Sequence, residues 1–477
     1  MSRKTFLITL IIIILFSSIA YGNAGPTYWE GNPALEVLSV EENSPIVVEK
    51  EYLTFDFTRP ELDKYTDYSK AGLVTASYEM SNPTDKEVSV QMAFPLISRI
   101  TDLESKATKI MVDNEDIAYE IFIGDTVDGV LNRVDEDKYN ELDFDSILNS
   151  ISNAAYIPQN FKLDDIGKLY RFDIENTSDK GIHFVIDFTH DKEKTKIFSD
   201  GFTSYHGNEE GATEIGSYIH WEESLELFVL GQDIDFNINV YSDVDKKETN
   251  ENYLLQEESR SISVQDYLID YFENYIENND YYTDLPYQQL LNLYLKNADE
   301  MFIQANAYIW LSELTSFKHY DWFFVLLYQV KFSPSEIRDI SVSYITKGTM
   351  DKKDTVEPLH TYEYLLNPAS SWADFKDLNI EIIPPQDSPF IIESSLELVR
   401  NEEGSYIGRF ESLPEEDLTF TLYEKEEVTF IDKIAASLDR AFYILPIFIV
   451  PIIAIITIII IVFLIKRYKK NKNWDNI

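Results

Sequence analysis

The sequence contains no cysteine, few basic residues and few glycines, and each shortage excludes a class of function. Without cysteine, a disulfide, a thiolate nucleophile and a cysteine-ligated metal site are all excluded. The 40 lysines and arginines stand against 84 aspartates and glutamates, for a net charge of -44. This excludes an ordinary duplex nucleic-acid binder, because phosphate affinity comes from clustered basic residues. The 16 glycines form no phosphate-cradling motif.

What is present indicates a folded chain. Apolar residues make up 44% of the sequence and aromatic residues 14%, which is too much for a disordered protein. The length of 477 residues is enough for two or three domains of roughly 150 residues each.

Residues 1–24 have the layout of a secretory signal peptide. Arg3 and Lys4 precede an apolar run at 6–15, and small residues follow it. We expect cleavage after Gly22, with Ala24 as the second candidate position. An uncleaved anchor is the alternative, and it normally has a longer apolar run.

Residues 442–465 are uncharged and strongly apolar, and their length suits a membrane-spanning helix. Pro446 and Pro451 should kink it, which a membrane helix tolerates. The basic tail at 466–477 follows directly, and such a cluster predicts a cytoplasmic C-terminus. The sequence therefore predicts a single-pass type I protein of the cell membrane with an extracellular ectodomain.

The charge distribution agrees with this orientation. Seven of the 40 basic residues but only one of the 84 acidic residues lie at the two predicted cytoplasmic ends, so the part between them is strongly acidic. Such a surface favours solubility and repels anionic polymers, and we expect weak divalent-cation association at many places. A large exported chain without cysteine is more typical of bacteria than of eukaryotes.

Residues 73–81 and 87–95 are the first clear strand pair. Val74, Ala76, Tyr78 and Met80 alternate with polar residues, and the second segment alternates in the same way, which predicts half-buried strands. The segment 82–86 between them has strong turn chemistry. We therefore expect a hairpin that ends at Pro95.

Further strands of this kind predict a mainly β fold with two antiparallel, Ig-like β-sandwich regions. The strand expected at 231–240 has the clearest alternation, with Asp233 and Asp235 on its polar face. Helical spacing in the middle of the chain predicts an insertion between the sandwiches. A first helix begins at an N-cap at Ser263, with Tyr267 and Tyr271 on one face, a second begins at about 285, and a third, or its continuation, covers about 298–314. A faint echo between 74–78 and 340–344 suggests a duplication.

These patterns predict the following order: signal peptide 1–24, first sandwich 25–250 with a short helix near 144–155, helical insertion 260–318, second sandwich 319–426, juxtamembrane helix 427–441, span 442–465 and tail 466–477. The apolar stripe of 427–441 fits either an extension of the spanning helix, which we favour, or a helix on the membrane surface.

The sequence contains no recognisable catalytic or cofactor-binding motif. No two of the six histidines are spaced as zinc ligands, and HExxH is absent. Ser204 lies two residues from His206, but without the flanking glycines of a nucleophile elbow. The acidic stretch 135–145 departs from a calcium loop at several ligand positions, and we read it as a solvated loop.

Two other groups of residues are candidate binding sites. The Asp233 and Asp235 ladder offers oxygen ligands, although strand alternation alone predicts it. Four tryptophans have the surface for stacking on a ligand, although core packing is the commoner role of such residues: Trp221, Trp310, Trp322 and Trp372. We therefore assign no catalytic residue and no cofactor, and the metal ligands stay open.

Three segments resemble uncharacterised membrane-anchored surface proteins of Gram-positive bacteria. They are Val74 to Pro95 with Asn82-Pro-Thr-Asp85 and Ala93-Phe-Pro-Leu96, Phe332 to Tyr344, and Leu366 to Trp372 leading to Phe375 and Leu378. The first is also distantly similar to vault/inter-α-trypsin-type β-sandwich domains. The resemblance implies a sandwich fold at the cell surface, and it brings no catalytic residues.

The sequence favours a surface binding or scaffold protein that is not an enzyme. A sensory or regulatory subunit of a membrane complex is the alternative, since the short tail holds no signalling enzyme. A hydrolase with paired carboxylates is the third reading, and it requires two acids about 5–10 Å apart. We expect an integral membrane protein that binds no nucleic acid and has a protein partner at the surface or in the membrane.

Overall fold

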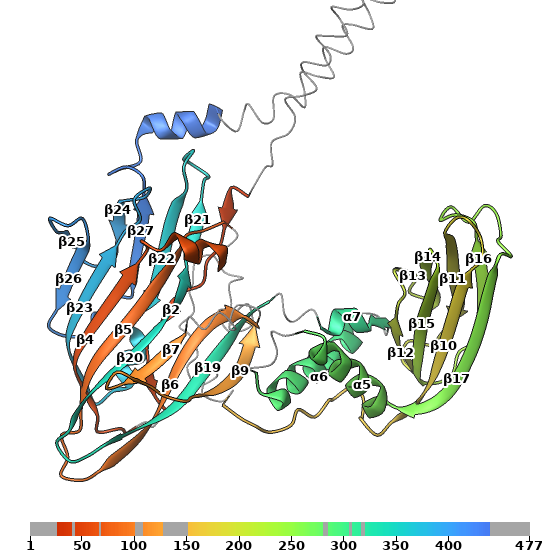
Figure 1. The fold of residues 1–477 in the computed structure, drawn as a ribbon, viewed down its shortest axis with the longest axis horizontal. Helices are drawn as coiled ribbons and strands as arrows, with labels where there is room; N and C mark the ends of the chain where they lie inside the picture. Colours follow the sequence, from red (N-terminus) through yellow and green to blue (C-terminus); the bar gives the residue numbers. More distant parts are fainter. Residues whose placement is uncertain are drawn as a thin grey trace, which may run out of the picture. The chain divides into compact units, whose positions relative to one another are not determined.

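The computed structural model describes residues 26–40, 43–65, 68–100, 108–126, 151–279, 285–304, 308–315 and 320–438. It confirms a mainly β protein with several sheets (Figure 1). No helix in these ranges is long and apolar enough to cross a membrane. The predicted signal peptide at 1–24, the span at 442–465 and the tail at 466–477 lie outside the described residues.

The chain divides into two compact units. Unit 1 comprises residues 1–94, 107–118 and 328–477, and unit 2 comprises residues 95–106 and 119–327. This division differs from the predicted boundaries, which place 25–250 and 319–426 in separate sandwiches. Strands from both of those ranges pair within unit 1, because β5 (Ala71–Ser81) lies beside β20 (Ile337–Lys347) along its whole length.

Unit 1 is built from two sheets. The eight-stranded sheet has the order β25 (Val399–Arg400), β26 (Tyr406–Phe410), β23 (Asp374–Ile383), β4 (Val47–Asp56), β5, β20, β7 (Lys109–Val112) and β8 (Glu115–Asp116). The six-stranded sheet has β1 (Tyr28–Trp29), β21 (Thr349–Asp351), β22 (Leu359–Leu365), β27 (Leu418–Tyr423) and β24 (Phe390–Ser394), with β2 (Ala34–Leu35) on β22. Phe55 of β4 packs edge-on against Phe420 of β27, with 5.3 Å between ring centroids, so the two sheets meet face to face.

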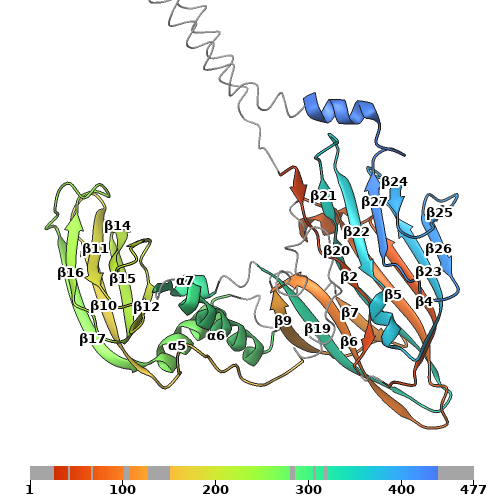
Figure 2. The ribbon, with the colours of Figure 1, turned by 180° about the vertical axis from the view of Figure 1, so that it is seen from behind.

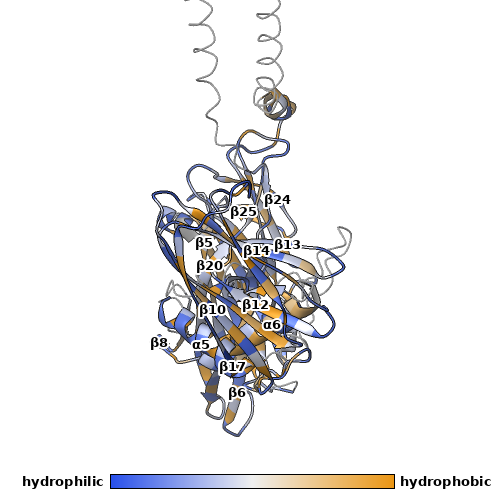
Figure 3. Cartoon of the chain, turned by 90° about the vertical axis from the view of Figure 1, so that its right-hand side faces the viewer, coloured by the Kyte–Doolittle hydropathy of each residue, from blue (hydrophilic) through white to orange (hydrophobic). Residues whose placement is uncertain are grey.

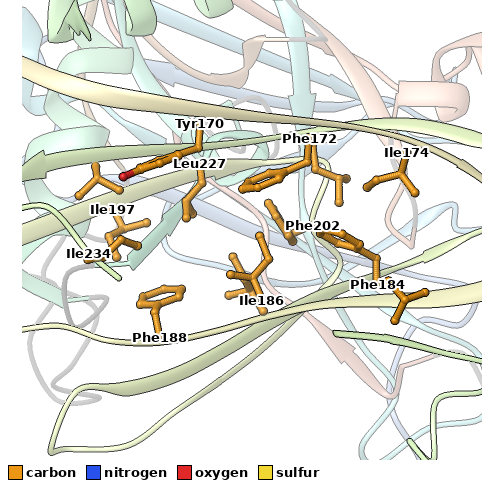
Figure 4. Packing of buried hydrophobic residues seen from close by; sticks show 14 of the residues in the cluster. Tyr170, Phe172, Ile174, Phe184, Ile186, Phe188, Ile197, Phe202, Leu227 and Ile234 are labelled. Carbon is orange, nitrogen blue, oxygen red and sulfur yellow. The ribbon is translucent and has the colours of Figure 1, made fainter. Parts of the chain in front are cut away.

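Unit 2 also contains two sheets. One has the order β17 (Tyr253–Ser263), β10 (Ile166–Asn176), β15 (Glu222–Gly231), β12 (Thr195–Asp200) and β18 (Tyr308–Trp310). The other has β13 (Ser204–Gly207), β14 (Ala212–Ile219), β11 (Ile182–Thr189) and β16 (Phe236–Tyr241). Their inner faces form one apolar core in which Phe172 of β10 packs on Phe184 of β11 (Figure 4). Apolar and polar residues alternate along these strands (Figure 3), as period-two patterning requires.

A further four-stranded sheet contains the strands at 88–99 and 321–332, along which the chain passes from one unit to the other. Its order is β3 (Leu38–Ser39), β6 (Val88–Arg99), β19 (Asp321–Phe332) and β9 (Glu120–Thr126). The predicted hairpin at 73–95 is therefore wrong in its pairing. Both segments are strands, but β5 and β6 belong to different sheets, and β6 continues past Pro95 to Arg99.

The helices of unit 2 lie where helical spacing predicts them. They are α5 (Val264–Glu277), α6 (Tyr287–Gln304) and the short α7 (Leu311–Leu314) (Figure 2). The segment at about 298–314 continues the helix that begins near 285, which is one of the two predicted alternatives, but this helix, α6, ends at Gln304 and is followed in the chain by β18 and α7. Two 3-10 turns, η1 (Pro60–Tyr65) and η4 (Asn367–Ser371), lie in unit 1.

Two local predictions need correction. The described part of the helix expected at 144–155, residues 151–155, is not helical. The strand expected at 231–240 begins only at Phe236, because Gly231 turns the chain with a φ of +98° and the Asp233 side chain bonds elsewhere. Residues 430–438 form a helix within the segment predicted at 427–441.

Candidate functional site

A cleft of about 530 Å³ in unit 2 opens between α5 and one face of the five-stranded sheet. Its wall carries charged, amide and hydroxyl side chains: Arg171, Asp200, Ser224, Glu226, Arg260, Tyr267, Asp270, Tyr271, Asn274, Tyr275, Asn278 and Asn279. This is the opposite face of the sheet from the one that forms the apolar core.

The position of α5 follows from the end of β17. Ser263, the last residue of β17, caps the helix because its hydroxyl accepts a hydrogen bond from the Asp266 N–H at 3.0 Å. The N–H groups of Val264 and Gln265 donate to the carbonyl oxygens of Asp165 and Leu163. Several donors of the first turn are thereby satisfied, and the helix starts at a defined point on the sheet edge.

An aromatic stack holds α5 against the sheet. Tyr267 lies parallel to Phe228 of β15, with ring centroids 4.6 Å apart and an interplanar angle of 21°. On the same face of the sheet Phe198 of β12 packs against Phe302 of α6 at 4.9 Å. The apolar end of this sheet face is thus covered by helices, and its polar end lines the cleft.

Two carboxyl groups lie next to each other at that polar end. Asp200 of β12 and Glu226 of β15 are directly opposite in the antiparallel register. Burial raises the pKa of each carboxyl above its usual range, because removal from water disfavours the charged form. The pKa of Glu226 is also pulled down by the charge of Arg171 and pushed up by that of Asp200.

Arginine completes the same row of side chains. Arg171 of β10 is opposite Glu226 in register, and its Nη1 lies 3.4 Å from Glu226 Oε1. Its Nη2 donates to the Ser224 hydroxyl at 3.1 Å, and its Nε lies 3.1 Å from Asp173 Oδ1. These partners fix the guanidinium at the wall of the cleft.

The helix supplies tyrosines and amides to the opposite wall. Burial raises the pKa of Tyr271 to about 12, so its hydroxyl stays protonated and can donate. The side-chain amide of Asn274 donates to the Asp270 carbonyl at 2.8 Å, and that of Asn278 to the Asn274 carbonyl at 2.7 Å. In each amide the carbonyl oxygen is left as an acceptor.

One buried hydroxyl at the cleft has no partner. Tyr267 is 5% exposed, and its hydroxyl makes no hydrogen bond within the described structure. Burial and the nearby carboxyl groups of Glu226 and Asp200 raise its pKa well above the usual range. A buried polar group without a partner is costly, and Tyr267 is one of the residues that line the cleft, so this hydroxyl is a candidate donor to a ligand.

A second, more acidic hollow of about 620 Å³ lies at the loops after β11, β13 and β15. His190 lies there with neither ring nitrogen hydrogen-bonded in the described structure, and burial lowers its pKa. Asp191, Glu193, Glu209, Glu210 and Asp233 surround it. Within the described residues, however, no three His, Asp or Glu side chains are placed to hold a metal ion.

Of the candidate side chains predicted from the sequence, Asp233 lines the second hollow, and the others line neither. The Ser204 hydroxyl donates to the Gly216 carbonyl at 3.1 Å, and His206 is exposed. Asp233 accepts from Lys168 at 2.8 Å and from the Tyr170 hydroxyl at 2.6 Å, so it forms no ladder with Asp235. The acidic stretch 135–145 lies outside the described residues.

The tryptophans have different surroundings. Trp322 and Trp372 are buried, and the Trp372 indole N–H donates to the Val37 carbonyl at 3.2 Å, which is a core role. Trp310 packs edge-on near Tyr205, and Trp221 is 77% exposed. None of them lines the α5 cleft.

No sequence signal pointed to the residues of the cleft. Asp200 comes after the short strand segment Ile197-Phe-Ser, which contains no motif, and Glu226 lies in an ordinary alternating strand pattern. Their adjacency depends on the pairing of β12 with β15, which is set by the whole sheet. Only the helical spacing of Tyr267 and Tyr271 was visible beforehand.

Comparisons with known proteins give no family. No protein-family model matches the chain, and no curated protein matches it. Among solved structures, a "putative nutrient binding protein" of Legionella pneumophila is similar over 83% of this chain and 73% of its own, at 10% identity and a TM-score of 0.32. The mu-homology domain of yeast delta-COP matches over 46% and 97%, at 8% identity and a TM-score of 0.08. Scores this low carry no argument about fold or function.

Proposed function

We propose that the chain is a membrane-anchored binding protein of the cell surface that holds a polar ligand in the α5 cleft. The observation that carries the proposal is the cleft itself. It combines the paired carboxyl groups of Asp200 and Glu226 with two arginines, tyrosine hydroxyls and amides. Donors and acceptors are mixed and both charges are present, which suits a neutral ligand rich in hydroxyl groups better than a strongly charged one.

The cellular setting in this proposal comes from the sequence. The signal-peptide layout of 1–24, the apolar run 442–465 and the basic tail 466–477 support an extracellular ectodomain with a cytoplasmic C-terminus. The resemblance to membrane-anchored surface proteins of Gram-positive bacteria agrees with that setting. We assign the chain no catalysis and no cofactor.

Binding of defined probes by the full chain in nanodiscs tests the proposal. Isothermal titration would compare chitotriose and maltotriose with trialanine and spermidine, which represent neutral hydroxyl-rich, zwitterionic and cationic ligands. We expect an oligosaccharide to bind and Glu226→Gln to weaken it about 3- to 10-fold, the effect of one lost hydrogen bond. Glu257→Gln, an exposed change on β17 outside the cleft, should leave binding unchanged. Binding of none of the four probes, or equal effects of both variants, would overturn the proposal.

An acid-pair hydrolase is the second candidate, and the adjacency of Asp200 and Glu226 favours it. Two carboxyl groups facing one cleft are the minimum that glycoside hydrolysis requires. Product analysis after prolonged incubation with the same oligosaccharides separates the two functions. Turnover that is lost in both Asp200→Asn and Glu226→Gln would favour the hydrolase, whereas binding without turnover supports the binding protein.

A regulatory subunit is the remaining alternative. It needs a second membrane protein, because the predicted tail at 466–477 is too short for a signalling domain. A stoichiometric membrane partner that copurifies from detergent-solubilised envelopes, together with an empty cleft in the binding assay, would favour this function over the first.

A further inference from the structure

The helix at residues 430–438 shows its apolar side to solvent. Phe430 and Ile431 are 76% and 75% exposed, and Ile434 and Leu438 are 45% and 55% exposed. At about 100° per residue these four side chains fall within a stripe roughly 100° wide. Soluble proteins normally turn such a stripe inward, so a stripe facing outward requires an apolar partner.

The opposite side of the helix is buried. Asp432 and Ala436, which lie on that side, are 8% and 2% exposed. Asp432 accepts from the backbone N–H of Thr429 at 2.8 Å, which closes the first turn as a capping box. Its other oxygen accepts from Lys425 at 2.6 Å, and this lysine lowers the pKa of Asp432 to about 2. A rotation that turned the apolar stripe inward would break the bond between Asp432 and Lys425 and expose Ala436.

The chain itself indicates what covers the stripe. Only residues 439–441 separate Leu438 from the apolar run that begins at Phe442. Four Cα steps of 3.8 Å span at most about 15 Å. The interfacial layer of a bilayer is itself several ångströms deep on each side of the hydrocarbon core. If 442–465 crosses the membrane, Leu438 must therefore lie at or next to the membrane surface, and the rest of the exposed stripe follows on the same helix within about 12 Å.

We propose that the helix at 430–438 is a second membrane contact, with Phe430, Ile431, Ile434 and Leu438 immersed in the interfacial region of the bilayer. This inference rests on the proposed membrane anchor at 442–465. The helix lies on the surface, as interfacial amphipathic helices do, and it is not a simple extension of the spanning helix. Its other face is bonded to Lys425, which lies shortly after β27 of unit 1, so the contact keeps this end of unit 1 near the membrane.

Spin labelling of the full chain in liposomes tests this directly, since a chain without cysteine accepts a label at one introduced site only. The variants are Ile431→Cys and Ile434→Cys on the stripe and Val399→Cys as an exposed apolar control, because Val399 is 63% exposed on the edge strand β25. The measurement compares how often the spin label collides with oxygen, which concentrates in lipid, and with a water-soluble nickel chelate. We expect the oxygen-to-nickel ratio at 431 and 434 to be several-fold higher than at 399.

A label at Ala454→Cys, inside the apolar run, separates this inference from the anchor. A lipid-like ratio at 454 with a water-like ratio at 431 and 434 would overturn the interfacial helix and leave the anchor standing. A water-like ratio at all positions would overturn both. Protection of 431 and 434 from both reagents would show that protein covers the stripe, which also overturns the inference.

Discussion

Asn82 and Asn176 make the same set of hydrogen bonds in the two units. Each side-chain amide donates to the carbonyl four residues later, Lys86 at 2.7 Å and Lys180 at 2.8 Å. Each also donates at 3.0 Å to a distant carbonyl, that of Ser333 or His220. Each side-chain oxygen accepts from the backbone N–H two residues later.

The surroundings of the two asparagines match as well. Asn82 connects β5 to β6, and Asn176 connects β10 to β11, and each pair of strands lies in two different sheets. The distant carbonyl lies in a second loop that connects strands of two sheets. For Asn82 this loop joins β19 to β20, and for Asn176 it joins β14 to β15. β5 pairs with β20 as β10 pairs with β15. The same four-strand arrangement therefore occurs once in each unit.

We predict that Asn82→Ala and Asn176→Ala each destabilise their own unit. Both side chains are nearly fully buried, and the change leaves buried carbonyl groups without a donor, at a cost of about 2–4 kcal/mol. Hydrogen exchange of the full chain should show lost protection in β5 and β20 for the first variant and in β10 and β15 for the second. Asn176→Asp keeps the accepting oxygen and should fall between wild type and Asn176→Ala. Unchanged protection in both alanine variants would contradict the assigned role.

The same asparagines show how far the sequence could predict the fold. The turn at Asn82-Pro-Thr-Asp-Lys86 was visible from residue types, and so were the strands on either side. The sheet to which each strand belongs was not visible, because it depends on carbonyls at 332 and 333 that are about 250 positions away in the chain. The echo between 74–78 and 340–344 suggests two copies in separate sandwiches, whereas these segments are direct neighbours in one sheet.

The candidate site was less visible still. Helical spacing predicted α5 and its Ser263 cap, because capping is a local interaction. Asp200, Glu226 and Arg171 come from three strands whose register is fixed by long-range pairing, and no local pattern marks them. The alternation at Asp233 and Asp235 is confirmed, because both side chains are exposed and Ile234 between them is buried. The bonds of Asp233 to Lys168 and Tyr170, which occupy its carboxylate, depend on a distant strand and have no local pattern.

Glu36 and Glu51 form a buried acid pair in unit 1, and both are 0% exposed. Glu36 accepts from the Tyr78 hydroxyl, from the Tyr364 hydroxyl at 2.8 Å and from the Val37 N–H at 3.0 Å. The carboxyl oxygens of Glu51 accept no hydrogen bond from a hydroxyl or N–H group in the described structure. Burial and the charge of Glu36 raise the pKa of Glu51 well above the usual range. Burial raises the pKa of Glu36 as well, although its hydrogen bonds from Tyr78, Tyr364 and Val37 oppose this shift. Of the two carboxyl groups, Glu51 is therefore the one that keeps its proton to the higher pH.

This pair predicts a stability that falls as the pH rises. A carboxyl group whose pKa is raised by folding contributes its full stability below its unfolded pKa and loses it as the pH rises toward the folded pKa. The slope for one such proton is up to about 1.4 kcal/mol per pH unit. Glu51→Gln imitates the protonated acid, so its advantage over wild type should grow between pH 5 and pH 8, measured by denaturant unfolding.

The matched variant Glu36→Gln should behave differently. It places an amide NH₂ where an oxygen accepts from tyrosine hydroxyls, so we expect lower stability than wild type at both pH values. Parallel pH profiles for wild type and Glu51→Gln would show that no proton is held between the two carboxyl groups.

The cap of α5 links stability to the cleft. Ser263→Ala removes the hydroxyl that accepts from the Asp266 N–H and should cost about 1 kcal/mol. Because Asp270, Tyr271 and Asn274 follow on this helix and line the cleft, we also expect faster exchange of the first α5 amides and weaker oligosaccharide binding. Ser261→Ala, an exposed change on β17, is the control. Slower or unchanged exchange at the start of α5 would contradict the capping role.

The unpartnered hydroxyl of Tyr267 should show a trade-off between stability and binding. Without ligand, Tyr267→Phe removes a buried hydroxyl that has no hydrogen bond and keeps the stack on Phe228, so we expect about 1 kcal/mol of added stability. Tyr294→Phe on α6 is the matched control, because its hydroxyl is also buried without a partner in the described structure but does not line the cleft. Both variants should raise the unfolding midpoint, while only Tyr267→Phe should weaken oligosaccharide binding. Equal binding by the two variants would mean that the Tyr267 hydroxyl does not meet the ligand, and a lower midpoint in either would show that the hydroxyl has a partner.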